Sequence, residues 1–273
     1  MKMLLLLAVA GIALGGPSGE QPSTVALSEA HRPATGYASE YRAVYAPAAP
    51  ALDGDISDAG WKAAAWSGDF TSREGGGAPK RGSRFKAVYA KDALYVAVEC
   101  MEPTPEKMAD EHQAHEFWLC DVVEIFSCAA KNELLHLVCS ARGNLNDEIQ
   151  GKTSARTKGN VAWQAKSKIC ADRWTCEFRI PFLLFGAVPA DGEIAAPFNV
   201  CRNATTVNEL SSWSHTRSFK STANYGTLTL EKAPGELADG LRRLVDVSLI
   251  PESSEMKAKR EDVERIMNRL FGE

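Results

Sequence analysis

The sequence predicts an all-β fold, an antiparallel β-sandwich or barrel, followed by a C-terminal amphipathic helix. Short runs of alternating β-branched and aromatic residues recur through the middle of the chain, separated by Gly, Asn, Asp and Pro. No strand–helix alternation with a Gly-rich first turn appears, which disfavours a nucleotide-binding α/β fold. Beyond Pro234 the pattern changes to a helical period. With 273 residues, the chain is long enough for one large domain with appendages.

The N-terminus has the pattern of a secretory signal peptide. Lys2 precedes an apolar run over residues 3–14, and the small residues Gly15 and Gly16 follow. We therefore expect residues 1–16 to be cleaved and the protein to be secreted, periplasmic or at the cell surface. An uncleaved anchor is the alternative. The sequence contains no other segment apolar enough to cross a membrane.

Residues 17–45 are rich in Pro, Ala and Ser and predict a linker that ends in a short strand at 41–45. We assign residues 46–232 to the sandwich and residues 233–273 to a helical extension. At the start of the sandwich, Asp53 and Gly54 indicate a turn, and a short helical turn follows with Trp61 facing inward.

The first clear hairpin joins residues 85–89 to residues 94–100 through a turn at Lys91 and Asp92. Both arms carry β-branched and aromatic residues. Further strands are expected at residues 122–127, 134–140, 161–170, 174–180, 199–204 and 225–230.

The C-terminal helix is predicted from an apolar stripe at Val263, Ile266, Met267 and Leu270, with charged residues on the other face. Such a stripe is typical of a helix packed on the edge of a sandwich. The alternative is a helix that docks a protein partner or assembles copies of the chain.

The chain has seven cysteines, so at least one is free or pairs between chains. Export would permit disulfides. Cys170 and Cys176 flank an expected turn and could pair across the hairpin, although spacing alone does not fix their register.

The charge and motifs exclude several classes of function. A formal net charge of −4 provides no basic field for nucleic acid. No nucleophile elbow, zinc-protease motif or phosphate loop is present. The run from Asp110 to Glu116 contains His112 and His115, which could hold a metal ion. It matches no common zinc spacing, however, and such a run before a strand is more typical of a solvated surface.

Asp121 and Glu124 are the carboxylates most suggestive of a glycosidase pair. Positions three apart on a strand point to opposite faces, so these two side chains would not flank one glycosidic bond. We therefore predict a protein without catalytic activity.

The aromatic residues suggest sugar binding instead. A saccharide packs its C–H faces on aromatic rings and bonds its hydroxyl groups to polar side chains. Trp118 follows a charged loop and Trp213 lies in a polar stretch, so both are candidates for exposed rings. The alternative for each is a ring that covers the sandwich edge.

Five segments in sequence then resemble family 9 carbohydrate-binding modules and their DOMON-like relatives. They are Leu52-Asp53-Gly54-Asp55 with Asp58 and Trp61; Val88 to Val96; Trp118 to Phe126; Trp174 to Phe182; and the closing elements Asn199 to Arg202, Ser212-Trp213 and Tyr225 to Leu228. The resemblance spans residues 52–231 and implies an immunoglobulin-like antiparallel β-sandwich that binds a saccharide or polysaccharide.

The resemblance also implies site residues. Trp118 and Trp213 would clamp a sugar, and Glu124 would accept hydrogen bonds from its hydroxyl groups. The Arg expected on the next strand is absent. His136 occupies its approximate place and Arg142 lies beyond it. With these five we include Arg202 as a candidate for sugar contact. The resemblance further implies bound calcium, without assigned ligands.

Two structural alternatives oppose these roles: Asp121 and Glu124 could pair with Arg202 or another cation inside the sandwich, and Trp213 could belong to the core. Two alternative functions also stand. A b-type haem domain is one, because related sandwiches carry haem and axial ligands are available. A structural or interaction module, with a decayed sugar site, is the other. The candidate haem ligands are Met101, Met108, His112, His115 and His136.

Overall fold

The computed structural model of the chain describes residues 39–109, 119–129, 134–150, 156–158 and 163–248. The expected signal peptide, most of the linker, Trp118, His112 and His115, and the apolar stripe at 263–270 lie outside these residues. No helix in the described ranges has the length and apolar character needed to span a bilayer.

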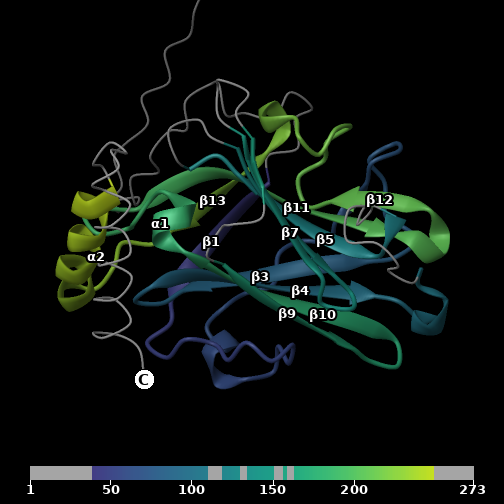
Figure 1. Cartoon of the computed structure of the whole chain (residues 1–273), viewed down its shortest axis with the longest axis horizontal. Coiled ribbons are helices and arrows are strands. Elements are labelled where there is room, and N and C mark those ends of the chain that lie inside the picture. The colour runs from purple at the N-terminus through teal and green to yellow at the C-terminus, as the bar shows by residue number, and fades with distance from the viewer. Residues whose placement is uncertain (1–38, 110–118, 130–133, 151–155, 159–162, 249–273) are drawn as a thin grey trace, which may run out of the picture.

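The described part of the chain forms a 13-stranded mixed sheet that folds into two packed layers (Figure 1). Sheet A contains β2, β5–β8 and β11–β13, and sheet B contains β3, β4, β9 and β10. The strands of sheet A are Thr71–Ser72 (β2), Val122–Ser127 (β5), Leu134–Ser140 (β6), Leu145–Gln150 (β7), Arg156–Lys158 (β8), Ile194–Ala204 (β11), Glu209–Ser212 (β12) and Gly226–Leu230 (β13). Those of sheet B are Ser83–Tyr89 (β3), Ala93–Met101 (β4), Gln164–Ile169 (β9) and Arg173–Pro181 (β10). The predicted sandwich is confirmed.

Strand β1 (Glu40–Tyr45) joins the two sheets and departs from the expected antiparallel pattern. Its first residues pair parallel with β13, from Glu40 with Thr227 onward. Its last two residues pair parallel with β3. The chain therefore crosses from one layer to the other within a single strand, and the strand path runs from β8 at one end to β9 at the other.

The outer face of sheet B is covered by the segment between β1 and β3. Trp61, in the 3-10 helix Ala59–Trp61, is buried as predicted against the outward side chains of β3 and β4. Its indole Nε1 donates to Glu177 on β10 at 2.8 Å, and the backbone N–H of Gly54 donates to the same carboxylate at 2.7 Å. Gly54 has φ +84°, and a Cβ at this position would lie 2.8 Å from the Cβ of Lys168. The first and fourth resembling segments thus contact each other directly.

The main core lies between the sheets and continues under two helices at one end (Figure 1). Helix α1 (Phe182–Phe185) follows β10, and α2 (Gly235–Ser248) begins directly after Pro234. Phe182, Phe185, Ala238 and Leu241 are buried in the core. Three further 3-10 helices are Pro105–Lys107, Thr205–Val207 and Thr222–Asn224.

The register corrects the suggested pairing of Cys170 with Cys176. Strand β10 places Cys176 opposite Ser167, whereas Cys170 lies at the turn, where its N–H donates to Arg173. Cys176 is buried in the core and Cys170 is half-buried. The two thiols therefore do not face each other across the hairpin.

Candidate functional site

Strand β5 carries the candidate site because its side chains alternate between the core and the outer face of sheet A. Val123 and Ile125 belong to the core between the sheets, whereas Phe126 belongs to an apolar cluster on the outer face. Asp121, just before the strand, is buried on the core side, and Glu124 reaches the outer face. The two carboxylates are thus on opposite faces, as their spacing predicts.

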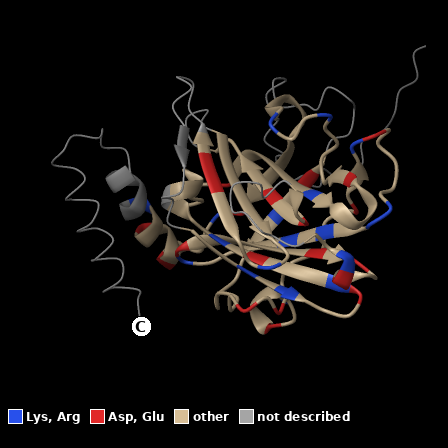
Figure 2. Cartoon of the chain, turned by 45° about the vertical axis from the view of Figure 1, so that its right-hand side comes forward, with Lys and Arg blue, Asp and Glu red and all other residues tan. Residues whose placement is uncertain are grey.

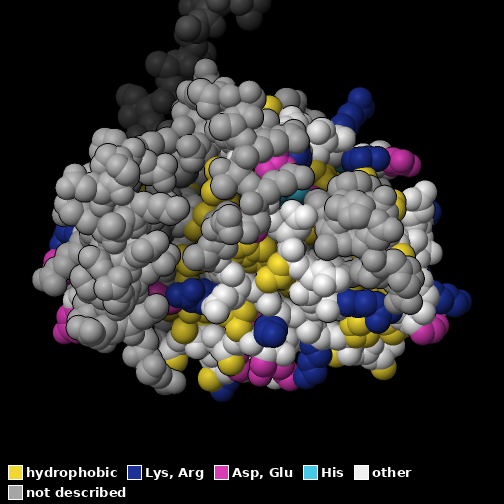
Figure 3. All heavy atoms as spheres, in the orientation of Figure 1, with side chains coloured by type: hydrophobic (Ala, Val, Ile, Leu, Met, Phe, Trp, Pro, Cys, Tyr) yellow, Lys and Arg dark blue, Asp and Glu magenta, His cyan; other side chains and the backbone are white. Residues whose placement is uncertain are grey.

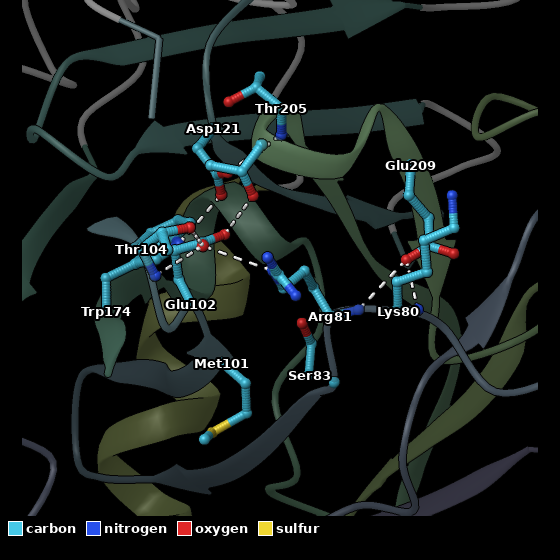
Figure 4. A network of polar contacts seen from close by, with 12 residues as sticks. Lys80, Arg81, Ser83, Met101, Glu102, Thr104, Asp121, Trp174, Thr205 and Glu209 are labelled. Atoms are coloured by element: carbon cyan, nitrogen blue, oxygen red, sulfur yellow. Dashed lines mark hydrogen bonds and ion pairs between the residues drawn. The ribbon is translucent and has the colours of Figure 1, made fainter. Parts of the chain in front are cut away.

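Asp121 lies in a buried polar network at one end of the sandwich (Figure 4). Its Oδ1 accepts from the indole Nε1 of Trp174 at 3.0 Å and lies 3.3 Å from Nη2 of Arg202. Its Oδ2 accepts from the backbone N–H of Thr205 at 3.1 Å. Burial raises the pKa of Asp121, and the charge of Arg202 opposes that rise.

Glu102 completes this network. Its carboxylate lies 3.6 Å from Arg202 and 3.4 Å from Arg81, and it accepts from the hydroxyl of Thr206 at 2.7 Å. Although burial raises the pKa of Glu102, the hydrogen bonds from Thr206 and Thr104 and the charge of Arg81 hold it below its ordinary value. Arg202 has no exposed side-chain surface, so a ligand outside the sandwich cannot contact it in this conformation.

On the outer face, Glu124 and His136 form a close pair. His136 lies on β6, opposite Phe126 in the strand register, and its Nε2 is 2.7 Å from Oε2 of Glu124. The Phe126 ring stacks on the imidazole with a centroid distance of 4.2 Å and an interplanar angle of 11°. The side chains of Glu124 and His136 keep 12% and 7% of their surface exposed. The structure thus brings together two of the predicted site residues.

Two further charged side chains extend this pair into what we call the outer row: Glu124, His136, Glu148 and Lys220. Glu148 lies opposite His136 on β7, and its Oε2 is 3.1 Å from Nζ of Lys220. Lys220 comes from the loop between β12 and β13 and is well exposed, whereas Glu148 is largely buried. The outer row therefore combines groups that accept and groups that donate hydrogen bonds.

Aromatic side chains lie next to the outer row. The ring of Phe126 is 6.0 Å from that of Tyr225 and 6.3 Å from that of Phe219. The hydroxyl of Tyr225 donates to the carbonyl of Phe219 at 2.7 Å, which ties the loop to the sheet. Figure 3 shows hydrophobic, basic and acidic side chains interspersed on the face of the molecule turned to the viewer.

Trp213 lies on the other side of sheet A from the outer row. Its backbone N–H donates to the carbonyl of Val200, and its ring packs edge-on against Phe85 of sheet B, with the ring centroids 5.1 Å apart. The indole also fills the space above Gly226, where an added Cβ would come within 2.6 Å of the ring. Only 6% of Trp213 is exposed. Of the two alternatives for this residue, the structure shows the core position, and Trp213 and Glu124 share no common cleft.

The edge of Trp213 borders a shallow pocket of about 290 Å³. Ser39, Glu40, Gly68, Asp69, Thr71 and His215 line the rest of it. This pocket lies where the described chain begins, away from the outer row.

The remaining candidates are dispersed. Arg142 is exposed at the turn between β6 and β7, and Trp118 immediately precedes the described residues that lead into β5. The structure describes three of the candidate haem ligands. Met101 is exposed at the end of β4, Met108 is in the core, and His136 is on the outer face of sheet A.

The described residues contain no group of three or more His, Cys, Asp or Glu side chains arranged to hold a metal ion. Carbonyl oxygens and the residues outside the described ranges can also bind calcium. Bound calcium, and a metal at the run from Asp110 to Glu116, therefore stay predictions.

Sequence reasoning missed Glu148 and Lys220. The strand at 145–150 was not predicted, since its alternation is carried by Asn, Asp and Glu rather than by apolar residues. Had it been recognised, the pairing of β6 with β7 would have indicated an acidic group beside His136. Nothing in the local pattern around Lys220 indicates that its loop folds back over sheet A.

The comparison with protein families decides the family of this chain. The sequence profile described as "Carbohydrate family 9 binding domain-like" matches residues 52–233. The chain belongs to this family. No curated protein sequence matches it.

Solved structures show the same sandwich at low sequence identity. A family 9 carbohydrate-binding module from Caldicellulosiruptor kristjanssonii, in complex with cellotriose, superposes with a TM-score of 0.53 at 16% identity, covering 78% of this chain and 99% of that chain. A protein from Bacteroides uniformis ATCC 8492, provisionally described as carbohydrate-binding, gives 0.55 at 12% identity, covering 71% of this chain and 99% of that chain. At these identities the likeness concerns the fold.

Proposed function

We propose that this family 9-like domain is a non-catalytic saccharide-binding module that holds a sugar over the outer row of sheet A. The observation that carries the proposal is the Glu124–His136 pair, which is fixed on adjacent strands beside Phe126. Membership of a carbohydrate-binding family and a related fold seen with cellotriose support the same function.

The chemistry of the outer row suits hydroxyl groups. A carboxylate accepts hydrogen bonds from sugar hydroxyls, and such charge-assisted bonds are stronger than neutral ones. Among the described contacts, His136 forms a hydrogen bond only with Oε2 of Glu124, so Oε1 can accept a hydrogen bond from a ligand. Lys220 donates from the opposite end of the row, where it is well exposed. Because Lys220 and Glu148 are already paired, a neutral ligand leaves neither of these two ions unpaired.

An aromatic platform completes the proposal. Trp118 precedes Glu124 by six residues, and we assign it the stacking ring, while Trp213 is left in the core. Arg142, exposed on the turn after β6, is a further candidate for a hydrogen bond to the ligand. The ring of Trp118 would pack on one face of the sugar, and the outer row would form hydrogen bonds with the hydroxyl groups at its edge.

Export and the absence of catalysis are also part of the proposal. The N-terminal pattern predicts that the secreted chain starts near residue 17. The mass of the protein recovered from outside the cell measures this start directly. Prolonged incubation with cellotriose, followed by chromatography, should yield no shorter sugar, and a time-dependent product would contradict a binding-only role.

The experiment for the site is calorimetry with a panel of soluble oligosaccharides that includes cellotriose. Wild type should bind at least one of them. Glu124→Gln should weaken that binding about tenfold or more, because hydrogen bonds to a charged group contribute about 1.5–3 kcal/mol. Trp118→Ala should weaken it by a similar factor, since the ring would lose its buried apolar contact.

Glu99→Gln is the matched control. Glu99 keeps 10% of its side chain exposed, close to Glu124, and also forms ion pairs, with Arg84 and Arg173. It lies on the outer face of sheet B, so its variant should bind like wild type. Equal effects of Glu99→Gln and Glu124→Gln, or no binding by any sugar of the panel, would contradict the proposed site.

A further inference from the structure

Two arginines and a tryptophan come together on the outer face of sheet B. Arg84 on β3 lies directly opposite Glu99 on β4, and Arg173 on β10 reaches the same carboxylate from the strand on the other side of β4. The residue that follows each of them in its strand belongs to the core, so these three side chains point outward. Trp66, from the segment before β3, is half-buried and lies against Arg84. We call these residues, together with Asp172, the Trp66 patch.

The two guanidinium groups are held in place but keep unused donors. Nε and Nη2 of Arg84 lie 2.9 and 2.8 Å from Oε1 of Glu99, and Nη1 of Arg173 donates to Oε2 at 3.1 Å. Among the described contacts, Nη1 of Arg84 and Nη2 of Arg173 have no acceptor. The two arginine side chains keep 40% and 39% of their surface exposed, whereas that of Glu99 keeps 10%. A ligand can therefore reach both guanidinium groups without displacing the carboxylate that positions them.

Lys86 adds a positive charge next to the Trp66 patch. It lies two residues after Arg84 on the same face of β3, and its Nζ donates to a backbone carbonyl at 2.8 Å rather than to a carboxylate. Asp172 pairs with Nε of Arg173 at 3.1 Å, but its side chain is 55% exposed, and such a pair is weak in water. At the patch, three cations therefore meet the two carboxylates of Glu99 and Asp172.

Asp58 and Glu177 are further carboxylates near Lys86. Both accept hydrogen bonds from N–H groups of the segment 51–61, and Glu177 is buried beneath that segment. Their oxygens are thus engaged away from the two exposed guanidinium groups, which are the first charged groups that a ligand meets.

Trp66 places an apolar surface beside these donors. The guanidinium carbon of Arg84 is 4.2 Å from the centroid of the indole ring, and Nζ of Lys86 is 4.8 Å from it. Cations at such distances are attracted to an aromatic face, which helps to hold the ring beside β3. Because Trp66 is only half-buried, part of the indole stays open to solvent. The patch thus combines an aromatic surface with directed hydrogen-bond donors, as a sugar site requires.

The arginines select the chemistry of the ligand. A guanidinium group is planar, stays charged at physiological pH, and can donate two parallel hydrogen bonds to a carboxylate. A uronic acid carries such a carboxylate on a sugar ring that can pack on an indole. We propose that the Trp66 patch is a second saccharide site, which binds oligosaccharides that contain uronates. Only the saccharide class of the ligand rests on the proposed function, because the patch lies on the other sheet from the outer row.

The test is calorimetry at low ionic strength with trigalacturonate and with its fully methyl-esterified form. The ester keeps the three rings but has no charge, so it should bind about tenfold more weakly or less, as loss of a charge-assisted hydrogen bond predicts. High salt should weaken the binding of the acid, because the guanidinium groups are exposed. Equal binding of acid and ester, or no binding of trigalacturonate by wild type, would overturn the proposal.

Variants locate the site. Arg84→Gln and Arg173→Gln should each weaken trigalacturonate binding about tenfold, while cellotriose binding by the same samples stays at the wild-type value and shows that they are folded. Arg42→Gln is the matched control, since Arg42 on β1 keeps 54% of its side chain exposed and also forms ion pairs with two glutamates. It should bind trigalacturonate like wild type. An equal loss in Arg42→Gln and Arg84→Gln would contradict the site.

Glu124→Gln separates this proposal from that of the outer row. It should weaken cellotriose binding and leave trigalacturonate binding unchanged. A loss of trigalacturonate binding in Glu124→Gln, with none in Arg84→Gln, would place the acidic sugar on the outer row and overturn the second site alone. Trigalacturonate binding that depends on Arg84, in a protein that binds no neutral sugar, would support the second site and contradict the outer row.

Discussion

Asp121 and Glu124 are three residues apart in one motif, yet they lie in opposite environments. Asp121 faces the interior, where an indole N–H, a guanidinium and a backbone N–H hold its carboxylate. Glu124 faces outward, where it pairs with His136 beside an aromatic ring. One motif therefore supplies a carboxylate that stabilises the sandwich and another that we assign to the ligand.

The comparison extends to the residues around each carboxylate. The interior network joins Asp121 and Glu102 to Arg202, all essentially without exposed side-chain surface. The outer row ends in a well-exposed lysine. Figure 2 shows acidic and basic positions interspersed over the molecule, so neither group belongs to a large field of one charge. We expect interior changes to affect unfolding and outer-row changes to affect binding.

The largest effect on stability is expected from Trp213→Ala. The indole packs against Phe85 and Gly226 in the core, so its loss leaves a large cavity and should lower the free energy of unfolding by about 3–5 kcal/mol. Urea unfolding followed by circular dichroism measures this. Saccharide affinity per folded molecule should stay at the wild-type value. A stable variant that had lost binding would instead favour a clamp role for Trp213.

Asp121→Asn should lower the free energy of unfolding by about 3 kcal/mol, because among the described residues it leaves the buried guanidinium of Arg202 with only Glu102 as an anionic partner. The same urea titration measures the loss. Combining it with Arg202→Met in a double-mutant cycle tests the coupling, since the second substitution removes the uncompensated charge. Strictly additive losses would show that the two residues do not act as a pair.

Glu124→Gln should affect saccharide binding more than stability, which is the reverse of Asp121→Asn. Binding should fall by about 2 kcal/mol, while the free energy of unfolding changes by about 1 kcal/mol or less, because the side-chain amide of Gln can still form a hydrogen bond with His136. Calorimetry and urea unfolding of the same sample separate the two quantities. A fall in stability as large as that of Asp121→Asn would remove the distinction between the two carboxylates.

Lys220→Met should have the smallest effect on folding. Its ion pair with Glu148 involves a well-exposed lysine, and such pairs contribute about 0–1 kcal/mol. Unfolding of the variant and of wild type should therefore nearly coincide at both low and high salt. A loss above 1 kcal/mol would mean that Lys220 holds the loop onto sheet A and belongs with the structural residues.

The sequence predicted those parts of the fold and site that depend on local alternation. The opposite faces of Asp121 and Glu124 follow from strand geometry, and the hairpin 85–100 follows from residue type. The parallel pairings of β1 and the offset of Cys176 from Cys170 depend on register between strands, which a local pattern does not contain. Lys220 reaches the outer row through a loop, so no period indicates its position.

The central claim is that saccharide binds over the outer face of sheet A and not beside Trp213. The most direct measurement is a titration of the protein with the best-binding oligosaccharide of the panel, followed by NMR of the histidine rings and indole N–H groups. We predict that the His136 ring signals shift with saturating behaviour and that the Trp213 indole signal does not. Shifts of the Trp213 indole, with an unchanged His136 ring, would contradict the claim.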